Sequence, residues 1–223
     1  MNTGPNGRRT SRPAPPAPAP GPRLRRLALY ARSRAVPATV AALVCAALLT
    51  VWMASRQDTY LDPYRRVPLV ALAPLLAAAA TGASLHTHSP ELDGTSVRRW
   101  WPRRLVHVLA VAALAATLLA LAVPGHVQEF GAAAMVRNTL GAIGITAGGA
   151  VLVGARLSWM PTTLYFSAVY LSASSPRVNN ATVVGWLMQP GPQHGAWAAA
   201  LALFVTGTAL CAARGARPEG PRV

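Results

Sequence analysis

Long apolar stretches follow one another along most of this chain and are separated by short polar segments. A helix needs about 20 mostly apolar residues to cross a bilayer. Six stretches reach or approach that length, and the fifth is short and diluted by Ser, Thr and Tyr. They cover residues 36–54, 67–85, 105–123, 131–154, 157–173 and 196–213. The pattern predicts an all-α, polytopic membrane protein with about six transmembrane helices within residues 36–213.

The residues before the first stretch fall into two parts. Residues 1–22 are rich in Pro, Gly and Arg and cannot bury a core, so we expect a disordered tail. Residues 23–35 place leucines between arginines, which favours an amphipathic helix at the membrane interface, although plain charge before a span is the alternative. No clean cleavage site follows the first span, which indicates a retained anchor. Residues 214–223 form a second tail.

Composition supports a membrane protein and its charge predicts an orientation. Hydrophobic residues make up 52% of the chain and charged residues 12%, against about 25% in soluble domains. The net charge is +15, and every basic residue is arginine. Arginine accumulates in cytoplasmic loops, and a cytoplasmic N-terminus puts sixteen arginines inside and four outside. We therefore expect both termini in the cytoplasm. High Ala, Pro and Arg content without Lys is typical of a GC-rich bacterial genome, so we expect the spans in a bacterial plasma membrane.

The same distribution argues against a nucleic-acid partner. The arginines are spread over the loops between the apolar stretches, whereas a nucleic-acid-binding protein gathers its basic residues on one folded surface. Anionic membrane lipids are the simpler partner. The chain has no Gly-x-x-x-x-Gly-Lys-Ser/Thr phosphate loop and no Gly-x-Ser-x-Gly elbow, and its six carboxylates lie outside the spans. We expect neither an enzyme nor a cofactor. Two loop histidines, His86 and His88, complete no recognised zinc pattern, so no metal is expected.

The loop between the second and third spans is the most distinctive polar segment. Ser89 can cap a short helix in which Pro90 and Glu91 occupy the first turn. This helix would dock on a soluble partner, and the alternative is an ordinary basic loop with an aromatic anchor. The candidate docking residues are Pro90, Glu91, Asp93, Arg98, Arg99 and Trp100.

The fourth span carries a charge and several glycines. Arg137 and Asn138 lie near its predicted outer end, where an intramembrane charge faces a protein interior or water. Arg137 could line a translocation path, pair with another helix or snorkel outward. Gly144 and Gly148 form a small-xxx-small pair, which permits close packing with a helix of this chain or of another subunit.

The outer connection between the fifth and sixth spans contains a short apolar run. Residues 183–188 are too few to cross a membrane. They favour a short helix at the outer interface with Trp186 as its anchor, and a partly ordered loop is the alternative.

Taken together, residues 23–213 resemble the membrane-spanning subunit of a type 2 ABC exporter of the actinobacterial kind. The resemblance rests on the interfacial segment 23–34, the loop helix 90–101, the close turn 154–157 and the outer element 183–188. It implies six spans, a second permease copy and a cytoplasmic ATPase on which 90–101 docks. By analogy alone it implies an amphiphilic substrate. A non-transporting multi-span protein with an immunity, assembly or scaffold role is the alternative.

Overall fold

A computed structural model describes residues 35–56, 67–86, 100–123, 130–172 and 185–217. Within these ranges the chain is all α, with six α-helices and two short 3-10 helices. The predictions for the tail 1–22, for the interfacial helix and for the loop 87–99 lie outside the described residues. The helices are α2 (Val36–Arg56), α3 (Val67–Ser84), α5 (Trp101–Ala122), α6 (Ala132–Val153), α7 (Trp159–Ser172) and α8 (His194–Arg214), and the 3-10 helices are η2 (Ala155–Leu157) and η3 (Trp186–Met188).

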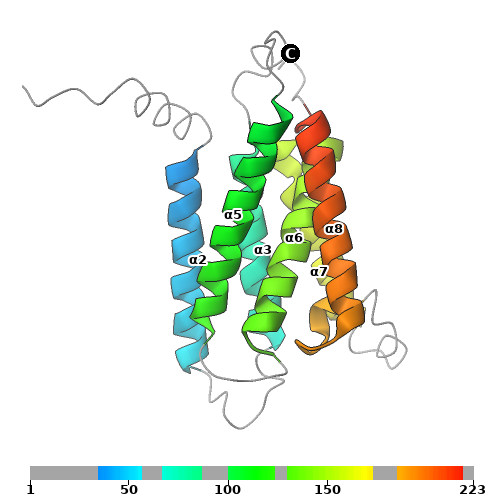
Figure 1. The fold of residues 1–223 in the computed structure, drawn as a ribbon. Coiled ribbons are helices and arrows are strands. Elements are labelled where there is room, and N and C mark those ends of the chain that lie inside the picture. The colour runs from blue at the N-terminus through cyan, green and yellow to red at the C-terminus, as the bar shows by residue number, and fades with distance from the viewer. Residues whose placement is uncertain (1–34, 57–66, 87–99, 124–129, 173–184, 218–223) are drawn as a thin grey trace, which may run out of the picture.

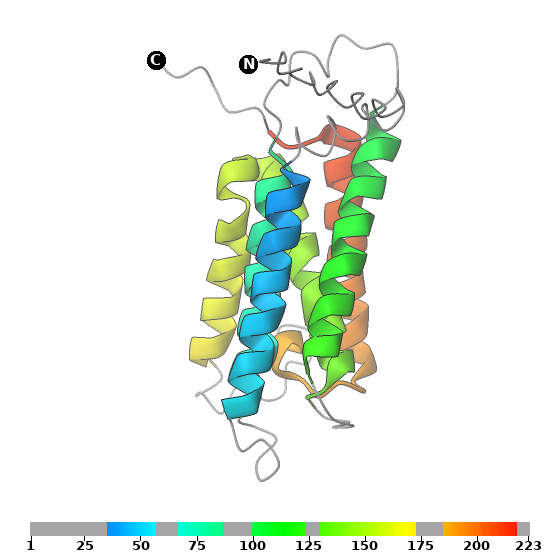
Figure 2. The ribbon, with the colours of Figure 1, turned by 90° about the vertical axis from the view of Figure 1, so that its left-hand side faces the viewer.

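The helices alternate in direction and form one bundle, with the start of α2 and the end of α8 at the same end (Figure 1). Helix α6 is the central element, because it packs against α3, α5, α7 and α8. It is also the most buried of the long apolar helices. Figure 2 shows α2 and α7 on the outside of the bundle. The polar side chains of α6 are therefore held inside the protein.

Among the residues that the structure describes, four helices are long and apolar enough to cross a membrane, namely α2, α5, α6 and α8. All six α-helices lie where the hydrophobic pattern predicted them. However, α3 has 18 residues, and α7 has 14 residues, which is about 21 Å of helix against a hydrocarbon core of about 30 Å. Helix α7 begins late because Gly154, with φ at 93°, ends α6 and the turn η2 follows it.

The outer faces of the bundle carry large apolar side chains. Leu48 on α2, Leu121 on α5 and Leu171 on α7 are 63%, 78% and 74% exposed. Scattered leucines of this kind are ordinary on soluble proteins. On α2 and α5 they cover helices that meet the length and hydropathy of a membrane span, whereas α7 is shorter. Such a surface fits a multi-pass membrane protein, whose exterior contacts hydrocarbon.

Helices α6 and α8 approach closely because glycines face each other at their crossing. A Cβ built on Gly207 would lie 2.8 Å from the carbonyl carbon of Gly144, and one built on Gly144 would lie 2.5 Å from Leu203 O. Neither position has room for a side chain. A Cβ on Gly148 would lie 3.6 Å from Gly207 Cα, an ordinary contact distance. The predicted small-xxx-small pair thus faces α8 of the same chain.

The two ends of the bundle differ in charge. The described arginines are seven, and five of them lie at the end that contains the start of α5 and the end of α8. These five are Arg103, Arg104, Arg156, Arg214 and Arg217. Arg56 lies at the opposite end, as the last residue of α2, and Arg137 is buried in α6. We call the first end the basic end and the second the far end.

A candidate functional site: a buried polar cluster at the far end

Arg137 and Asn138 lie side by side in the second turn of α6, and both side chains are fully buried. Arg137 Nε donates to Asn138 Oδ1 at 3.1 Å. Its two terminal nitrogens donate to the backbone carbonyls of Pro190 at 2.8 Å and Gln189 at 2.7 Å. No carboxylate belongs to the described part of the chain, so carbonyl dipoles and one amide surround this guanidinium. A buried cation that is hydrogen-bonded in this way avoids most of the cost of losing water.

Asn138 joins α6 to two further parts of the bundle. Its Nδ2 donates to Leu187 O at 2.8 Å and to Val70 O of α3 at 3.1 Å. The second acceptor is available because Pro74 lies inside α3, four residues after Val70. Proline has no N–H, so the carbonyl four residues earlier lacks its normal helical donor. The amide of Asn138 supplies that donor from a neighbouring helix, as unsatisfied backbone in a membrane requires.

The segment that supplies most of the acceptors folds back into the bundle. It runs from Gly185 through η3 to Gln193 and connects to the start of α8. Its carbonyls at Leu187, Gln189 and Pro190 accept from α6, and Gly191 O accepts from Trp197 Nε1 of α8 at 2.9 Å. A 3-10 helix as short as η3, and the irregular backbone that follows it, leave carbonyls without helical donors. Side chains of α6 and α8 provide those donors, and we call residues 185–193 the returning segment.

Trp186 fixes the returning segment between α6 and α7. Its ring is 1% exposed, stacks on Tyr165 with centroids 5.9 Å apart, and meets Phe166 edge-on at 6.5 Å. On the other side it covers Gly141, where an added Cβ would lie 2.8 Å from Trp186 Cζ2. The expected short helix is present over three residues. The expectation of Trp186 as an interfacial anchor was wrong, because Gly141 opens a slot that buries the ring.

The arrangement uses the polar atoms of Arg137 and Asn138 to hold parts of this one chain together. The hydrogen-bond partners of Arg137 are Asn138 of the same helix and the backbone of the returning segment, so these bonds do not join it to another helix. Pro74 and Val70 were not among the residues predicted from the sequence, and Gly141 was predicted only as one of several packing glycines in the fourth span. The proline within the apolar stretch of α3 was the signal in the sequence. Proline leaves the carbonyl four residues earlier without its helical donor, so another group must donate to that carbonyl.

Of the candidate docking residues, the structure describes Trp100. Pro90, Glu91, Asp93, Arg98 and Arg99 lie outside the described residues. Trp100 precedes α5, and the guanidinium of Arg103 lies over its ring at 5.0 Å. Arg217 lies at the end of α6, where its backbone N–H donates to Ala150 O at 2.9 Å and its Nη1 donates to Leu152 O at 3.1 Å. The first residues of the predicted C-terminal tail therefore pack on the bundle.

Within the described ranges, no three His, Cys, Asp or Glu side chains gather in a way that could hold a metal ion. Comparison of the chain with protein-family models, with curated proteins and with solved structures finds no match.

Proposed function

We propose that this chain is the membrane-spanning permease subunit of an ABC-type exporter in a bacterial plasma membrane. In this proposal all six helices cross the membrane, and both termini lie in the cytoplasm. A second copy or a sister permease completes the translocation path. A separate cytoplasmic ATPase docks on the loop between α3 and α5 and supplies the energy.

The observation that carries the proposal is the convergence of polar connections at the basic end. The end of α3, the start of α5, the turn η2 and the end of α8 meet there, with five arginines among the described residues. Arginine-rich ends face the cytoplasm. The loop that holds Pro90, Glu91 and Arg98 therefore begins and ends at the cytoplasmic face, where a docking helix could reach an ATPase.

The packing inside the chain supports a path between two subunits over a path through one. The polar side chains of α6 are used internally: Arg137 and Asn138 bind the returning segment, and Thr146 Oγ1 pairs with Thr162 Oγ1 of α7 at 2.6 Å. Gly144 and Gly148 of α6 face α8 and leave no side chain between the two helices at that point. A polar route through such packing would require breaking these bonds, so each chain contributes half of a path.

The experiment is affinity purification of the full-length tagged protein from membranes of its native host. The proposal predicts that a protein with the nucleotide-binding motifs of an ABC ATPase copurifies and that the complex hydrolyses ATP. Charge reversal at two loop positions, Glu91→Arg with Arg98→Glu, should remove that ATPase. Arg56→Gln at the far end is the matched control and should retain it. Unchanged recovery with the loop variant would refute the docking role.

Orientation is tested separately by fusing a reporter of cellular compartment after Glu129 or after Arg214. The proposal predicts an external reporter at Glu129 and a cytoplasmic one at Arg214. An external reporter at Arg214 would overturn the six-span arrangement.

A non-transporting membrane subunit is the second candidate, and one observation favours it. Among the described residues, the buried guanidinium of Arg137 donates to two carbonyls and an amide of its own chain, as in a structural support. The two candidate functions are distinguished by whether the chain is coupled to ATP hydrolysis. A subunit without transport activity leaves the ATP hydrolysis of any copurified protein unchanged and moves no substrate in vesicles, whereas a permease changes the ATPase rate.

A further inference from the structure

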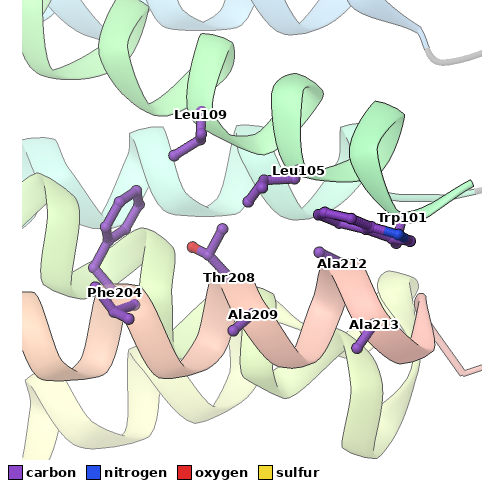
Figure 3. Close-up of a pocket in the computed structure, with 9 residues that line it drawn as sticks. Trp101, Leu105, Leu109, Phe204, Thr208, Ala209, Ala212 and Ala213 are labelled. Atoms are coloured by element: carbon purple, nitrogen blue, oxygen red, sulfur yellow. The ribbon is translucent and has the colours of Figure 1, made fainter.

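A groove of about 600 Å3 runs between α5 and α8 (Figure 3). Such a volume lies within the range of about 300–1,000 Å3 that is typical of ligand pockets. Its walls are one apolar stripe on each helix, and exposed members such as Val205 and Leu109 mark its open side. The lining residues are Trp101, Leu105, Leu109, Phe204, Val205, Thr208, Ala209, Ala212 and Ala213.

The length and position of the groove match one membrane leaflet. It extends from Trp101 to Leu109 along α5, about 12 Å at 1.5 Å per residue. Half of a hydrocarbon core is about 15 Å. Trp101 begins α5 at the basic end, at the level where tryptophan prefers the headgroup region. The groove therefore spans the apolar depth of the leaflet on the basic side and ends near the middle of the bundle.

One polar atom inside the groove has no partner. Thr208 is 3% exposed, and its hydroxyl oxygen makes no hydrogen bond in the structure. The usual solution for a helical threonine is a bond to the carbonyl four residues earlier, which Thr206 makes to Ala202 O and Thr139 makes to Met135 O. Figure 3 shows Thr208 pointing from α8 toward Leu105 and Leu109. An unpaired buried hydroxyl costs about 1–3 kcal/mol. The oxygen is covered in the orientation shown, and rotation about χ1 to another staggered position would turn it toward a ligand oxygen in the groove.

Positive charge stands at the open end of the apolar walls. Arg104 lies on α5 between the groove residues Trp101 and Leu105. Its guanidinium packs against Gly215, where an added Cβ would lie 2.7 Å from Arg104 Nη1. Arg214 is the last residue of α8 and is exposed. An arginine near the membrane surface attracts anionic headgroups. From the basic end inward, the groove presents arginine guanidinium groups, then Trp101, then the Thr208 hydroxyl, and then apolar side chains. A phospholipid presents its groups in a matching order, with the phosphate at the surface, the ester groups below it and the acyl chain deepest.

We propose that the α5–α8 groove binds one anionic membrane phospholipid, with an acyl chain along the apolar walls and the phosphate beside Arg104 and Arg214. The hydroxyl of Thr208 then donates to an ester carbonyl of the lipid. This inference does not depend on the transport function, because it requires only that α5 and α8 cross a membrane.

The test is native mass spectrometry of the full-length protein titrated with phosphatidylglycerol or phosphatidylcholine of identical acyl chains. Wild type should retain one phosphatidylglycerol at lower concentration than phosphatidylcholine. Arg104→Gln should weaken phosphatidylglycerol binding about fivefold and leave phosphatidylcholine nearly unchanged. Ala209→Phe fills the groove and should weaken both lipids about tenfold, since about two methylenes lose their site. Ala198→Phe, an exposed alanine of α8 outside the groove, is the matched control.

Thr208→Val removes the hydroxyl and keeps the shape, so it tests the polar contact without filling the groove. It should weaken retention of the ester lipid but not of an ether-linked phosphatidylglycerol. Equal retention of both lipids by wild type and by Ala209→Phe would overturn the proposal and show an adventitious additive only. A wild-type dimer that Ala209→Phe converts to a monomer, with unchanged lipid retention, would also overturn it and assign the groove to a second copy.

Discussion

Replacing Asn138 with leucine removes an amide that joins α6, α3 and the returning segment while it keeps a similar side-chain volume. Three hydrogen bonds disappear, to Val70 O, to Leu187 O and from Arg137 Nε. Each leaves a buried polar group without its partner. Because Asn138 is fully buried, water cannot replace the lost contacts without opening the bundle.

The size of the loss follows from hydrogen bonds measured inside other membrane proteins. These average about 0.6 kcal/mol and reach about 1.7 kcal/mol, so three bonds predict a loss of about 2 to 5 kcal/mol in the free energy of unfolding. Thr139→Val is the control in the next position of α6. The Thr139 hydroxyl donates only to Met135 O within the same helix, so we expect its loss to cost less than about 1 kcal/mol.

The proline in α3 allows a sharper test than the single substitution. Pro74→Ala restores a backbone N–H that can donate to Val70 O, which then no longer needs Asn138. In this background Asn138→Leu should be less harmful by about 1 kcal/mol, the worth of one such bond. The four proteins form a double-mutant cycle whose coupling energy isolates the contact between α3 and α6.

Unfolding in mixtures of SDS and mild detergent, followed by tryptophan fluorescence, gives the four free energies. The chain has six tryptophans, so every variant is made in a background in which the other five are phenylalanine. Trp186 then reports the far end, because its ring leaves the slot between α6 and α7 when the returning segment detaches. A coupling energy below about 0.5 kcal/mol, the usual error of additivity, would refute the assignment of Asn138 as the donor that Pro74 makes necessary.

Three further substitutions probe the same packing. Arg137→Met removes the bonds to Gln189 O and Pro190 O and should lower stability by about 2 to 4 kcal/mol in the same assay; stability equal to wild type would show that these bonds contribute nothing net. Gly141→Ala should displace Trp186 at a cost of about 1 to 3 kcal/mol and shift its emission to longer wavelength; unchanged emission would contradict the slot. Gly207→Ala should separate α6 from α8 at a similar cost, measured by thermal unfolding, whereas Gly148→Ala, where an added Cβ meets ordinary contact distance, should be nearly neutral.

The sequence predicts the positions of the helices well because hydrophobicity over about 20 residues is a local property. It also indicated that α7 would be the weakest span, and α7 is the shortest of the described α-helices. The direction in which α2 and α8 cross the membrane remains a prediction from arginine counting. The bundle places most described arginines at one end, in agreement with the alternation on which that counting depends.

The contacts of the candidate site could not be predicted in the same way. Nothing local to Asn138 reveals that a carbonyl 68 residues earlier is free, and nothing local to Trp186 reveals that Gly141 leaves room for its ring. Tryptophan prefers membrane interfaces on average, so the pattern favoured an exposed position. Burial of Trp186 is decided by the shapes of α6 and α7 together, which only the assembled bundle defines.

The hydrogen bonds of Arg137 also impose an order on biogenesis. The carbonyl of Pro190 lies 53 residues further along the chain, so it is made roughly 3 to 10 s after Arg137 at ordinary translation rates of about 5–20 residues per second. During that interval α6 carries a cation for which the later acceptors do not yet exist. The guanidinium of Arg137 therefore stays close to water until those acceptors are made, either beside the insertion machinery or with α6 placed near the membrane surface. Once the returning segment is made, its carbonyls can accept from Arg137 and α6 can take its final position. The last third of the chain therefore controls when the central helix becomes fully embedded.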